Sequence, residues 1–482
     1  MTKKTSDWPE LPQPQREPVE SGADQSVAIK QPPHRTSPAL LTDLYELTML
    51  RAYFELGMED EAVFSLFVRR LPEHRNYLVA AGLDDVLHFL ETLAFDPAAI
   101  SYLEQLGLFS PRFLRHLEAL RFTGDVYAVP EGTVVFGNEP LLEVVAPMPQ
   151  AQLVETAVMN QIVLQTVLAS KAVRVVAAAQ GRTVVDFGMR RMHGFEATLK
   201  AARAFYIAGV DSTSNVAAGQ LYGIPVAGTM AHSYIQAHDD ELAAFRNFAR
   251  IYPETVLLVD TYDTLSGVRK VVQLARELGP DFKVRGVRLD SGDLGELARE
   301  SRRILDAAGL QSVGIFASGG LNEDVIRDLL EKGAPITGFG VGTDLGVSRD
   351  APSLDIAYKL VAYGGHDRMK LSPEKLILPG RKQVWRVEED GAAVRDVIAR
   401  SGENLAGRPL LVPVMKAGRR LPGSWTDLAA SRNRAREEIA RLPARVRALD
   451  PATPPYPVTL SRELEVTRDR LRAQLARASE SQ

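Results

Sequence analysis

Cysteine is absent from this sequence of 482 residues. Its absence excludes a disulfide framework, thiolate metal sites and cysteine nucleophiles, and it is compatible with a reducing compartment. The N-terminus also lacks the basic region and apolar run of a secretory signal, and no apolar stretch approaches the roughly 20 residues that span a bilayer. We therefore expect a cytoplasmic protein that is not embedded in a membrane.

An excess of charge of one sign is also missing. The chain has 57 Lys and Arg against 61 Asp and Glu, a formal net charge of -4, so nothing marks the whole chain as a nucleic-acid binder. Any phosphate-binding site must then be a local concentration of donors. Hydrophobic residues make up 45% and charged residues 24%, an ordinary globular balance, and the length predicts two or three domains.

Proline and hydrophobic periodicity divide the first part of the chain. Residues 1–37 are rich in proline among polar residues and have no hydrophobic period, which predicts a disordered arm. Residues 38–150 begin with apolar residues at helical spacing and continue with strand-like runs, helices and short strands broken by turns. We interpret 38–150 as an N-terminal α+β domain.

The middle of the chain, residues 151–364, alternates between strand-like and helix-like runs after a helix near 151–180. The strand-like runs lie at 183–188, 209–215, 225–230, 255–262, 283–293, 313–320 and 338–343. This alternation predicts a parallel sheet. Apolar strands buried on both faces favour a closed β/α barrel, although an open doubly wound sheet fits the alternation too.

The alternation ends after about residue 350. Residues 367–387 predict a hairpin around Pro379 and Gly380 that returns to the first domain, so that about 365–425 complete it. The segment 426–482 is rich in Arg, Ala and Glu and predicts a helical C-terminal tail.

Polar residues gather where the strands of the predicted barrel end. Active sites of parallel β/α barrels lie at the carboxyl ends of the strands. The residues found there are Asp186, Arg190, Ser214, Asn215, Thr229, His232, Asp260, Asp263, Arg288, Asp290, Asp293, Ser318, Gly319, Gly320, Gly342 and Thr343. So many hydroxyls, acids and glycines predict a polar, phosphorylated sugar as the ligand.

Two of these strand ends resemble phosphate cradles. Residues 318–320 (Ser-Gly-Gly) lie between a strand and a helix, so that backbone N–H groups and a helix N-terminus can face an anion. Gly342 and the hydroxyl of Thr343 follow the next strand. A glycine-rich turn after a strand is often only a tight connection, but two on consecutive strands indicate a phosphate site. A Walker-type GxxxxGK[ST] loop is absent.

Charged residues at the strand ends have competing interpretations. Asp290 and Asp293 either cap the following helix or bind ribose hydroxyls or Mg²⁺. Arg288 lies on a strand, where an unpaired charge is costly, so it should meet an anion or an acid. His232 lies on the rim of the barrel, with His193 and His238 as rivals for a catalytic role.

Eight motifs carry a resemblance to a known family. They stand in the order LLTDLYELTM, LPEHRNYLVAAGL, VDFGMRRMHG, TSNVAAG, GTMAHSY, VRLDSGDL, ASGGLNE and GFGVGTDLG. Over about residues 38–425, the sequence closely resembles nicotinate phosphoribosyltransferases. The resemblance implies a type II phosphoribosyltransferase fold, in which an irregular β/α barrel of about seven strands packs on an α+β domain formed from both chain ends.

The resemblance also implies an activity. Nicotinate and 5-phosphoribosyl 1-pyrophosphate would give nicotinate mononucleotide and pyrophosphate in NAD biosynthesis, with coupled ATP hydrolysis, a requirement for Mg²⁺ and an ATP-dependent ligase classification. The family implies a homodimer in which the N-terminal domain of one subunit helps to close the site of the other. Small molecules are the expected partners, without nucleic acid or membrane.

The family's functional positions can be carried over to this sequence. By resemblance, His232 is phosphorylated by ATP, with Arg288 and Asp290 as further catalytic residues. The implied substrate-binding residues are Tyr45, Arg190, Ser214, Thr229 and Arg288. The implied phosphoribosyl-binding residues are Ser318, Gly319, Gly320, Gly342 and Thr343, and the implied metal ligands are Asp290 and Asp293.

Three alternatives stay open. Nicotinamide phosphoribosyltransferases place an aspartate where Ser214 aligns here, and a serine lets a carboxylate approach without like-charge repulsion. A shift of register toward Asp211 would restore an acid. A quinolinate phosphoribosyltransferase should need more converging basic residues, and a binding module would require loss of the rim residues, none of which is lost.

Overall fold

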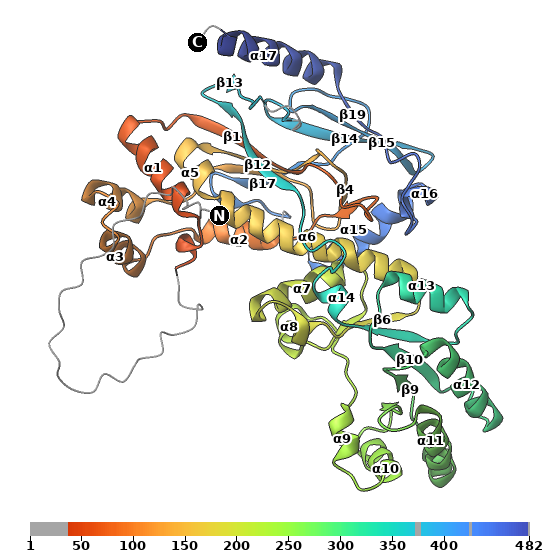
Figure 1. The fold of residues 1–482 in the computed structure, drawn as a ribbon. Helices are drawn as coiled ribbons and strands as arrows, with labels where there is room; N and C mark the ends of the chain where they lie inside the picture. The colour runs from red at the N-terminus through yellow and green to blue at the C-terminus, as the bar shows by residue number, and fades with distance from the viewer. Residues whose placement is uncertain (1–36, 372–376, 424–426, 481–482) are drawn as a thin grey trace, which may run out of the picture.

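The computed structural model describes residues 37–371, 377–423 and 427–480. Apart from Ser37, the predicted proline-rich arm lies outside the described residues. Figure 1 shows a β-rich body, which combines segments from both ends of the chain, above a parallel sheet with its helices. The confirmed fold class is thus α/β, with a curled parallel sheet packed on an α+β domain formed from both chain ends.

A seven-stranded sheet forms the centre of the β-rich body. Its order is β13 (His366–Asp367), β12 (Ile356–Tyr363), β1 (Glu61–Val68), β5 (Pro140–Pro147), β3 (Asp125–Ala128), β17 (Val412–Lys416) and β18 (Arg419–Arg420). Strand β1 pairs antiparallel with β5 on one side and with the late strand β12 on the other. Packed beside this sheet are α1 (Leu44–Leu56), α2 (Leu83–Thr92), α3 (Pro97–Gln105), α4 (Pro111–Ala119) and α5 (Met148–Leu153). Because β1 is central and buried along seven of its eight residues, the sheet requires both chain ends to form its core.

The antiparallel hairpin expected after the parallel sheet lies further along the chain than the sequence predicted. Strands β14 (Lys382–Glu389) and β15 (Ala392–Arg400) pair around Asp390 and Gly391, which both have positive φ. This Asp-Gly pair suits the tight turn that a right-handed strand twist favours. Within the described residues the predicted hairpin around Pro379 and Gly380 is wrong, because 377–381 form no strand and the Gly380 N–H donates to the Val361 carbonyl of β12.

One long helix connects the two bodies. Helix α6 (Glu155–Ala178) contacts α2, β2 (Leu78–Val79) and β12 in the β-rich body and α7, α13 and α14 in the other. With α5 it forms the stretch Met148–Ala178, which by length and composition is apolar enough to cross a membrane. Its apolar window is 72% buried inside the protein, which assigns it to the core.

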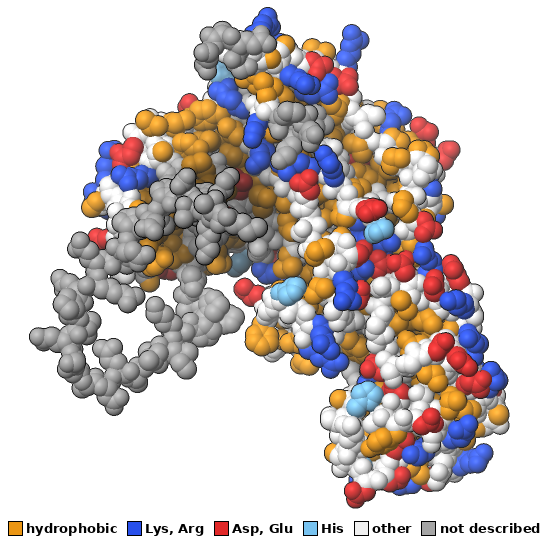
Figure 2. Space-filling view, in the orientation of Figure 1, with side chains coloured by type: hydrophobic (Ala, Val, Ile, Leu, Met, Phe, Trp, Pro, Cys, Tyr) orange, Lys and Arg blue, Asp and Glu red, His pale blue; other side chains and the backbone are white. Residues whose placement is uncertain are grey.

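The parallel sheet is a curled half-barrel of six strands. Its order is β7 (Ser212–Thr213), β6 (Thr183–Asp186), β11 (Gly338–Val341), β10 (Gly314–Ser318), β9 (Gly286–Leu289) and β8 (Val256–Leu258). The covering helices include α7 (Phe195–Ile207), α8 (Val216–Tyr222), α10 (Glu241–Ile251), α11 (Thr264–Leu278), α12 (Leu294–Ala307) and α13 (Glu323–Glu331), with the short α9 (His232–Gln236) and α14 (Thr343–Gly346) at strand ends. In Figure 2, acidic and basic side chains are interspersed over these helices, as the small net charge predicts.

The strand predicted over 225–230 does not form a full strand. It makes one parallel bridge, between Val226 and Thr213 of β7. The chain then leaves the sheet and runs toward α9 (Figure 1). Within the described residues, the sheet order therefore ends at β7 and β8, and the barrel is not closed by strand pairing.

The segment that the sequence predicted as a helical C-terminal tail contributes to both bodies. It contains α15 (Leu428–Arg441), α16 (Ala444–Arg447), β19 (Val458–Leu460) and α17 (Arg462–Glu480). Helix α15 packs on α7, while β19 joins a four-stranded sheet with β15, β14 and β16 (Arg408–Pro409). Glu438 of α15 receives a hydrogen bond from the buried Arg386 of β14 at 2.5 Å.

Candidate active site

Two adjoining cavities open at the carboxyl ends of the parallel strands, the edge at which the sequence predicted the site. The glycine-loop cavity has a volume of about 390 Å³, and its walls include Arg191, Ser318, Gly319, Gly320, Gly342, Thr343 and Arg349. The histidine cavity has a volume of about 350 Å³, and its walls include Ser214, Thr229, Met230 and His232. Both cavities share Phe187, Arg190, Arg288 and Asp290. Together they can hold a ligand with two chemically different parts that meet at these shared residues.

The glycine loop after β10 has a backbone that other residues would strain. Gly319 and Gly320 have φ of +84° and +63°, in the left-handed region. A Cβ on Gly319 would lie 1.9 Å from the Asp290 carbonyl oxygen, so glycine lets the two loops approach closely. Asn322 then caps α13 by accepting from the Val325 N–H at 2.9 Å. A strand end, a tight glycine turn and a helix N-terminus thus meet at this cavity, an arrangement suited to an anion.

Arg288 of β9 lies at the junction of the two cavities. Its Nη1 donates to Asp290 Oδ1 at 3.2 Å and to Ser318 Oγ at 3.3 Å, and its Nη2 donates to the Met230 carbonyl at 2.6 Å. The Ser318 hydroxyl donates to the same Asp290 carboxylate. Burial lowers the pKa of Arg288, against the opposing charges of Asp290 and Asp260. These contacts hold a guanidinium at the point where the two halves of a ligand would meet.

His232 begins α9 and presents its imidazole to the histidine cavity. Its Nδ1 lies 3.2 Å from the Thr261 hydroxyl, and its Nε2 lies 3.8 Å from Asp290 Oδ2. The side chain is 41% exposed, so the ring is oriented by two neighbours while Nε2 stays accessible. The other two candidate histidines do not line either cavity. His238 has its Nδ1 2.9 Å from the Tyr234 carbonyl, and His193 is exposed.

The acidic residues of the site divide into distinct roles. Asp260 is buried; its Oδ2 accepts from the Asp290 N–H at 2.9 Å and the Ser291 hydroxyl at 2.8 Å. Asp293, predicted as a metal ligand or a cap, caps α12 by accepting from the Glu296 N–H at 3.0 Å, and it lies outside both cavities.

Asp186 of β6 holds the turn that follows it. Its two carboxylate oxygens accept from the Gly188 N–H and from the Thr213 hydroxyl, each at 2.7 Å. Burial raises the pKa of Asp186, against these two hydrogen bonds. This buried carboxylate ties β6 to β7 just before the turn that carries Arg190.

Within the described residues, no group of three or more His, Cys, Asp or Glu side chains could hold a metal ion. A divalent cation here would be bound through one or two carboxylates together with oxygens of the ligand, the way in which Mg²⁺ is commonly held.

Two arginines after β6 face the glycine-loop cavity. Arg190 and Arg191 belong to the short 3-10 turn Met189–Arg191, and both are exposed. Neither has an ion-pair partner among residues 37–371, 377–423 and 427–480. The sequence pattern indicated Arg190, but not Arg349, which pairs with Asp344 at 3.5 Å on the cavity wall. Exposed arginines beside glycine loops are suited to binding phosphate.

Ser214 and Asp211, the two residues between which the register was left open, take different places around β7. Ser214 lines the histidine cavity. Asp211 lies at the opposite end of β7, where its Oδ2 accepts from the Val184 N–H at 2.9 Å and its Oδ1 pairs with Arg432 at 3.2 Å. The hydroxyl of Ser214, rather than a carboxylate, therefore faces the cavity.

Tyr45 is the predicted site residue that the structure places far from the others. It lies on α1 in the β-rich body, half-exposed, and outside both cavities. Burial and a hydrogen bond with Glu46 raise its phenol pKa. Within one chain, Tyr45 does not take part in the site.

A larger cavity of about 590 Å³ lies between α6, α7 and α15. Its walls include Ala177 and Gly209, which precede β6 and β7, so it opens at the amino ends of the strands. In β/α folds this face contributes stability, while chemistry takes place at the carboxyl ends. We therefore assign the active site to the two smaller cavities.

Comparisons with known proteins agree on one family. A model described as the nicotinate phosphoribosyltransferase (NAPRTase) N-terminal domain matches residues 40–163, and one described as the nicotinate phosphoribosyltransferase (NAPRTase) family matches residues 183–367. The chain is 56% identical over 439 residues to nicotinate phosphoribosyltransferase pncB2 of Mycobacterium tuberculosis, covering 91% of this chain and 93% of the relative. It is 42% identical over 359 residues to nicotinate phosphoribosyltransferase of Bacillus subtilis, covering 73% of each.

Two solved structures extend this agreement to the fold. The crystal structure of human nicotinic acid phosphoribosyltransferase matches with a TM-score of 0.79 and 30% identity, over 89% of this chain and 99% of that one. Nicotinate-nucleotide pyrophosphorylase of Pyrococcus furiosus matches with a TM-score of 0.70 and 24% identity, over 87% and 99%, a likeness of fold alone.

Proposed function

The chain belongs to the nicotinate phosphoribosyltransferase family, and we propose that it joins nicotinate to 5-phosphoribosyl 1-pyrophosphate with ATP hydrolysis through a phosphorylated His232. The observation that carries this proposal is the meeting of two cavities at Arg190, Arg288 and Asp290. The histidine cavity would take the aromatic acid, and the glycine-loop cavity would take the phosphates. Nicotinate mononucleotide and pyrophosphate are then the products.

The bond changes follow from this placement. The pyridine nitrogen forms a bond to the anomeric carbon while the bond from that carbon to the pyrophosphate oxygen breaks, and pyrophosphate leaves with the electron pair. No proton transfer is needed, so electrostatic stabilisation of the leaving group should dominate. Arg190 and Arg191 would attract the leaving phosphates, while Arg288 would orient the nicotinate carboxylate.

The acids at the strand ends fit a Mg²⁺ ion bound together with pyrophosphate. Asp260 Oδ1 is buried and has no hydrogen-bond partner among the described residues, and the carboxylate of Asp290 lies on the cavity wall. Asp290 would hold the ion on the cavity wall, and the buried Asp260, which lines neither cavity, would act on it through water. When bound, Mg²⁺ supplies charge neutralisation to pyrophosphate. Asp293 is engaged in capping α12 and is the weaker candidate.

His232 is the proposed acceptor of the phosphoryl group of ATP. A nitrogen–phosphorus bond would form on an imidazole nitrogen as the terminal phosphoryl group leaves ADP, and water would later hydrolyse it. The accessible Nε2 suits this step, because Thr261 orients the ring from the Nδ1 side. A phosphohistidine would bring negative charge beside Asp290 and would favour a bound cation there.

Ser214 supports nicotinate over nicotinamide as the substrate. A serine hydroxyl can donate to a carboxylate, whereas a carboxylate at this position would repel it and would instead accept from an amide NH₂. Ser214→Asp should therefore raise KM for nicotinate by about 10-fold or more, because removing such a discriminating contact costs at least ~1.4 kcal/mol. Unchanged kinetics would argue against this role for Ser214.

One experiment tests the proposal. Product formation from phosphoribosyl pyrophosphate is measured with nicotinate or nicotinamide, each with and without ATP, for the parent chain, His232→Ala and the control His193→Ala. We expect nicotinate mononucleotide from the parent and the control, at a rate that ATP increases, and no ATP effect in His232→Ala. A preference for nicotinamide would overturn the substrate assignment, and ATP stimulation that persists in His232→Ala would overturn the phosphohistidine.

We also propose that two copies of the chain form the working enzyme. Tyr45 lies outside both cavities of its own chain. The family resemblance implies a dimer in which the N-terminal domain of one subunit helps to close the site of the other. Tyr45 of a second copy would then complete the nicotinate site.

A further inference from the structure

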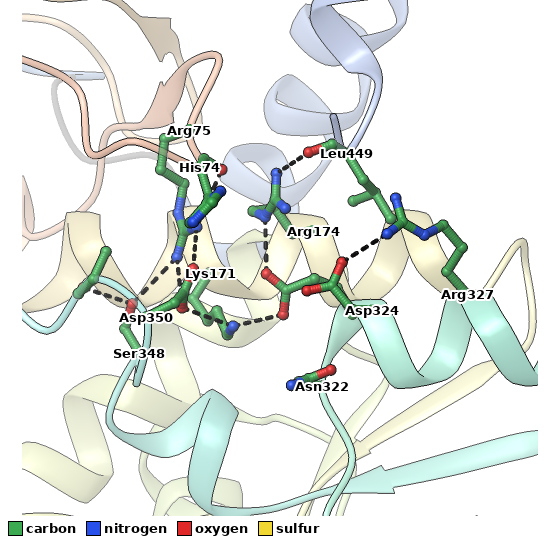
Figure 3. Close-up of polar contacts among 12 residues, drawn as sticks. His74, Arg75, Lys171, Arg174, Asn322, Asp324, Arg327, Ser348, Asp350 and Leu449 are labelled. Atoms are coloured by element: carbon green, nitrogen blue, oxygen red, sulfur yellow. Dashed lines mark hydrogen bonds and ion pairs between the residues drawn. The ribbon is translucent and has the colours of Figure 1, made fainter. Parts of the chain in front are cut away.

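A buried lysine forms ion pairs with one carboxylate from each of the two loop segments that line the glycine-loop cavity. Lys171 of α6 has a side chain only 2% exposed. Its Nζ donates to Glu323 Oε2 at 2.5 Å and to Asp350 Oδ1 at 2.8 Å (Figure 3). Lys171 lies outside both cavities, so no substrate contact explains its position.

The two carboxylates end the two segments that line the glycine-loop cavity. Glu323 is the first residue of α13 and follows the 318–320 turn after β10. Asp350 follows α14, which begins at Thr343 directly after β11. The intervening Arg349 lines the cavity itself. One ammonium group therefore links the two segments beyond the point where the ladder of β10 and β11 ends, at Ser318 and Gly340.

Two arginines complete the same network. Arg75 donates to Asp350 Oδ2 at 2.6 Å and to the Ser348 hydroxyl at 3.4 Å, and Arg174 donates to Glu323 Oε1 at 2.8 Å (Figure 3). Each carboxylate thus bonds to Lys171 and to one arginine. Arg75 comes from the N-terminal domain, so the network also ties this domain to the cavity.

Both carboxylates are held in the charged form. Burial acts to raise the pKa of Glu323, but the charge and hydrogen bond of Lys171, with that of Arg174, hold it below its ordinary value. For Asp350, the hydrogen bonds of Arg75 and Lys171 outweigh burial and hold the pKa well below its ordinary value. A buried ion pair of this kind is costly to break and has a defined geometry.

We propose that Lys171 is a positioning residue that fixes the spacing of the 318–320 and 342–344 segments and thereby the affinity for the phosphates of phosphoribosyl pyrophosphate. The inference rests on the proposed function, which assigns the glycine-loop cavity to those phosphates. Contacts in a phosphate cradle depend on the placement of its donors to a fraction of an ångström. The ladder of β10 and β11 holds the segments together as far as Ser318 and Gly340, so removal of the ammonium should let the parts beyond it move apart.

The test compares Lys171→Met with a matched variant, Lys382→Met. Lys382 is also fully buried beside a glutamate, with Nζ 3.1 Å from Glu143 Oε1, but it lies in the β-rich body and outside both cavities. We expect Lys171→Met to raise both KM for phosphoribosyl pyrophosphate and the Kd of inorganic pyrophosphate by ~10-fold or more, with KM for nicotinate changed less than ~2-fold. Lys382→Met should lower the melting temperature but leave all three constants unchanged.

Asp350→Asn is the milder second variant, because it keeps the shape of the side chain and weakens only the contacts to the 342–344 side. It should raise the Kd of pyrophosphate by ~3-fold, and it decides the question if Lys171→Met does not fold. A pyrophosphate Kd that stays at the parent value in the folded variants would overturn the positioning role. Failure of the parent itself to bind pyrophosphate would instead overturn the assignment of the cavity to phosphates.

Discussion

Two buried atoms at the candidate active site, Nε of Arg288 and Oδ1 of Asp260, have no hydrogen-bond partner within the described residues. Leaving such an atom unsatisfied costs about 1–3 kcal/mol, so an atom of this kind beside the cavities is a candidate for contact with a ligand. The two atoms carry opposite charge, and their residues lie at the ends of neighbouring strands β9 and β8. One suits an anionic ligand group and the other a cation, as expected for a nicotinate carboxylate and for Mg²⁺ bound with pyrophosphate.

Glu46 provides a pH-dependent test at the residue scale. It is fully buried on α1, where its Oε2 accepts from Gln152 at 2.9 Å and its Oε1 has no partner in the described part of the chain. Burial raises the pKa of Glu46 from 4.5 to about 7, against the hydrogen bond from Gln152. An acid whose folded pKa is raised stabilises the fold below its unfolded pKa and loses this contribution as the pH rises through the folded value.

Glu46→Gln should remove this dependence, because glutamine resembles the protonated acid. One pKa unit corresponds to about 1.4 kcal/mol. The free energy of unfolding of the variant, relative to that of the parent, should therefore rise by up to about 3 kcal/mol between about pH 5 and about pH 8. Urea unfolding at both pH values measures the gain. The exposed Glu61→Gln, which makes the same charge change on β1, serves as the control and should show none. A gain for Glu46→Gln that does not vary with pH would contradict the raised pKa.

At the scale of elements, substitutions at the start of α12 can distinguish a helix-capping role of Asp293 from a metal-binding role. Asp293 accepts from the Glu296 N–H, while Asp290 faces the cavities. Asparagine caps helices about as well as aspartate. Asp293→Asn should therefore keep the free energy of unfolding within about 0.5 kcal/mol of the parent value, whereas Asp293→Ala should lower it by about 1 kcal/mol. Neither should change the Mg²⁺ concentration for half-maximal activity, which Asp290→Asn should raise. An equal rise in Asp293→Asn would show that Asp293 binds the metal.

The strand ends were the part of the site that the sequence could predict. In a parallel sheet, apolar runs followed by Gly, Ser or Asp place their polar ends at one edge, so Ser214, Arg288 and Ser318 were found by position alone. The run 225–230 was predicted as a strand because Pro-Val-Ala-Gly-Thr-Met is apolar enough, yet only Val226 bridges to the sheet. Local pattern does not determine whether a neighbouring strand is within reach.

Contacts between distant segments could not be predicted in the same way. Two examples are the contact of His232 with Thr261 and the ion-pair network around Lys171. Both join residues from different elements, and such contacts produce no periodic pattern in the sequence. Hairpin placement failed for a related reason. Pro379 and Gly380 form a turn signal, but the Asp390 and Gly391 turn has the twist that the flanking strands require.

At the scale of the whole molecule, the two bodies act as one unit because the chain crosses between them repeatedly. Asn76 of the N-terminal domain donates to the Ala448 and Asp450 carbonyls and accepts from the Ala452 N–H. Arg432 of α15 donates to three carbonyls at the end of α7. The N-terminal domain is therefore held in a defined place relative to the half-barrel, a condition for presenting Tyr45 to a second copy.

A mixing experiment tests whether two copies share each site. Tyr45→Ala and Arg288→Ala should each be nearly inactive alone, because one lacks the presented tyrosine and the other lacks the guanidinium of the barrel. In a heterodimer of the two variants, the Tyr45→Ala chain keeps an intact barrel and receives Tyr45 from its partner, so one of its two sites is complete. With random exchange, about a quarter of all sites should be active. Activity of the mixture is compared with that of each variant and with Tyr45→Ala mixed with itself. If the mixture is no more active than the variants alone although exchange is demonstrated by mass, then Tyr45 does not act across an interface, and its role on α1 lies within its own chain.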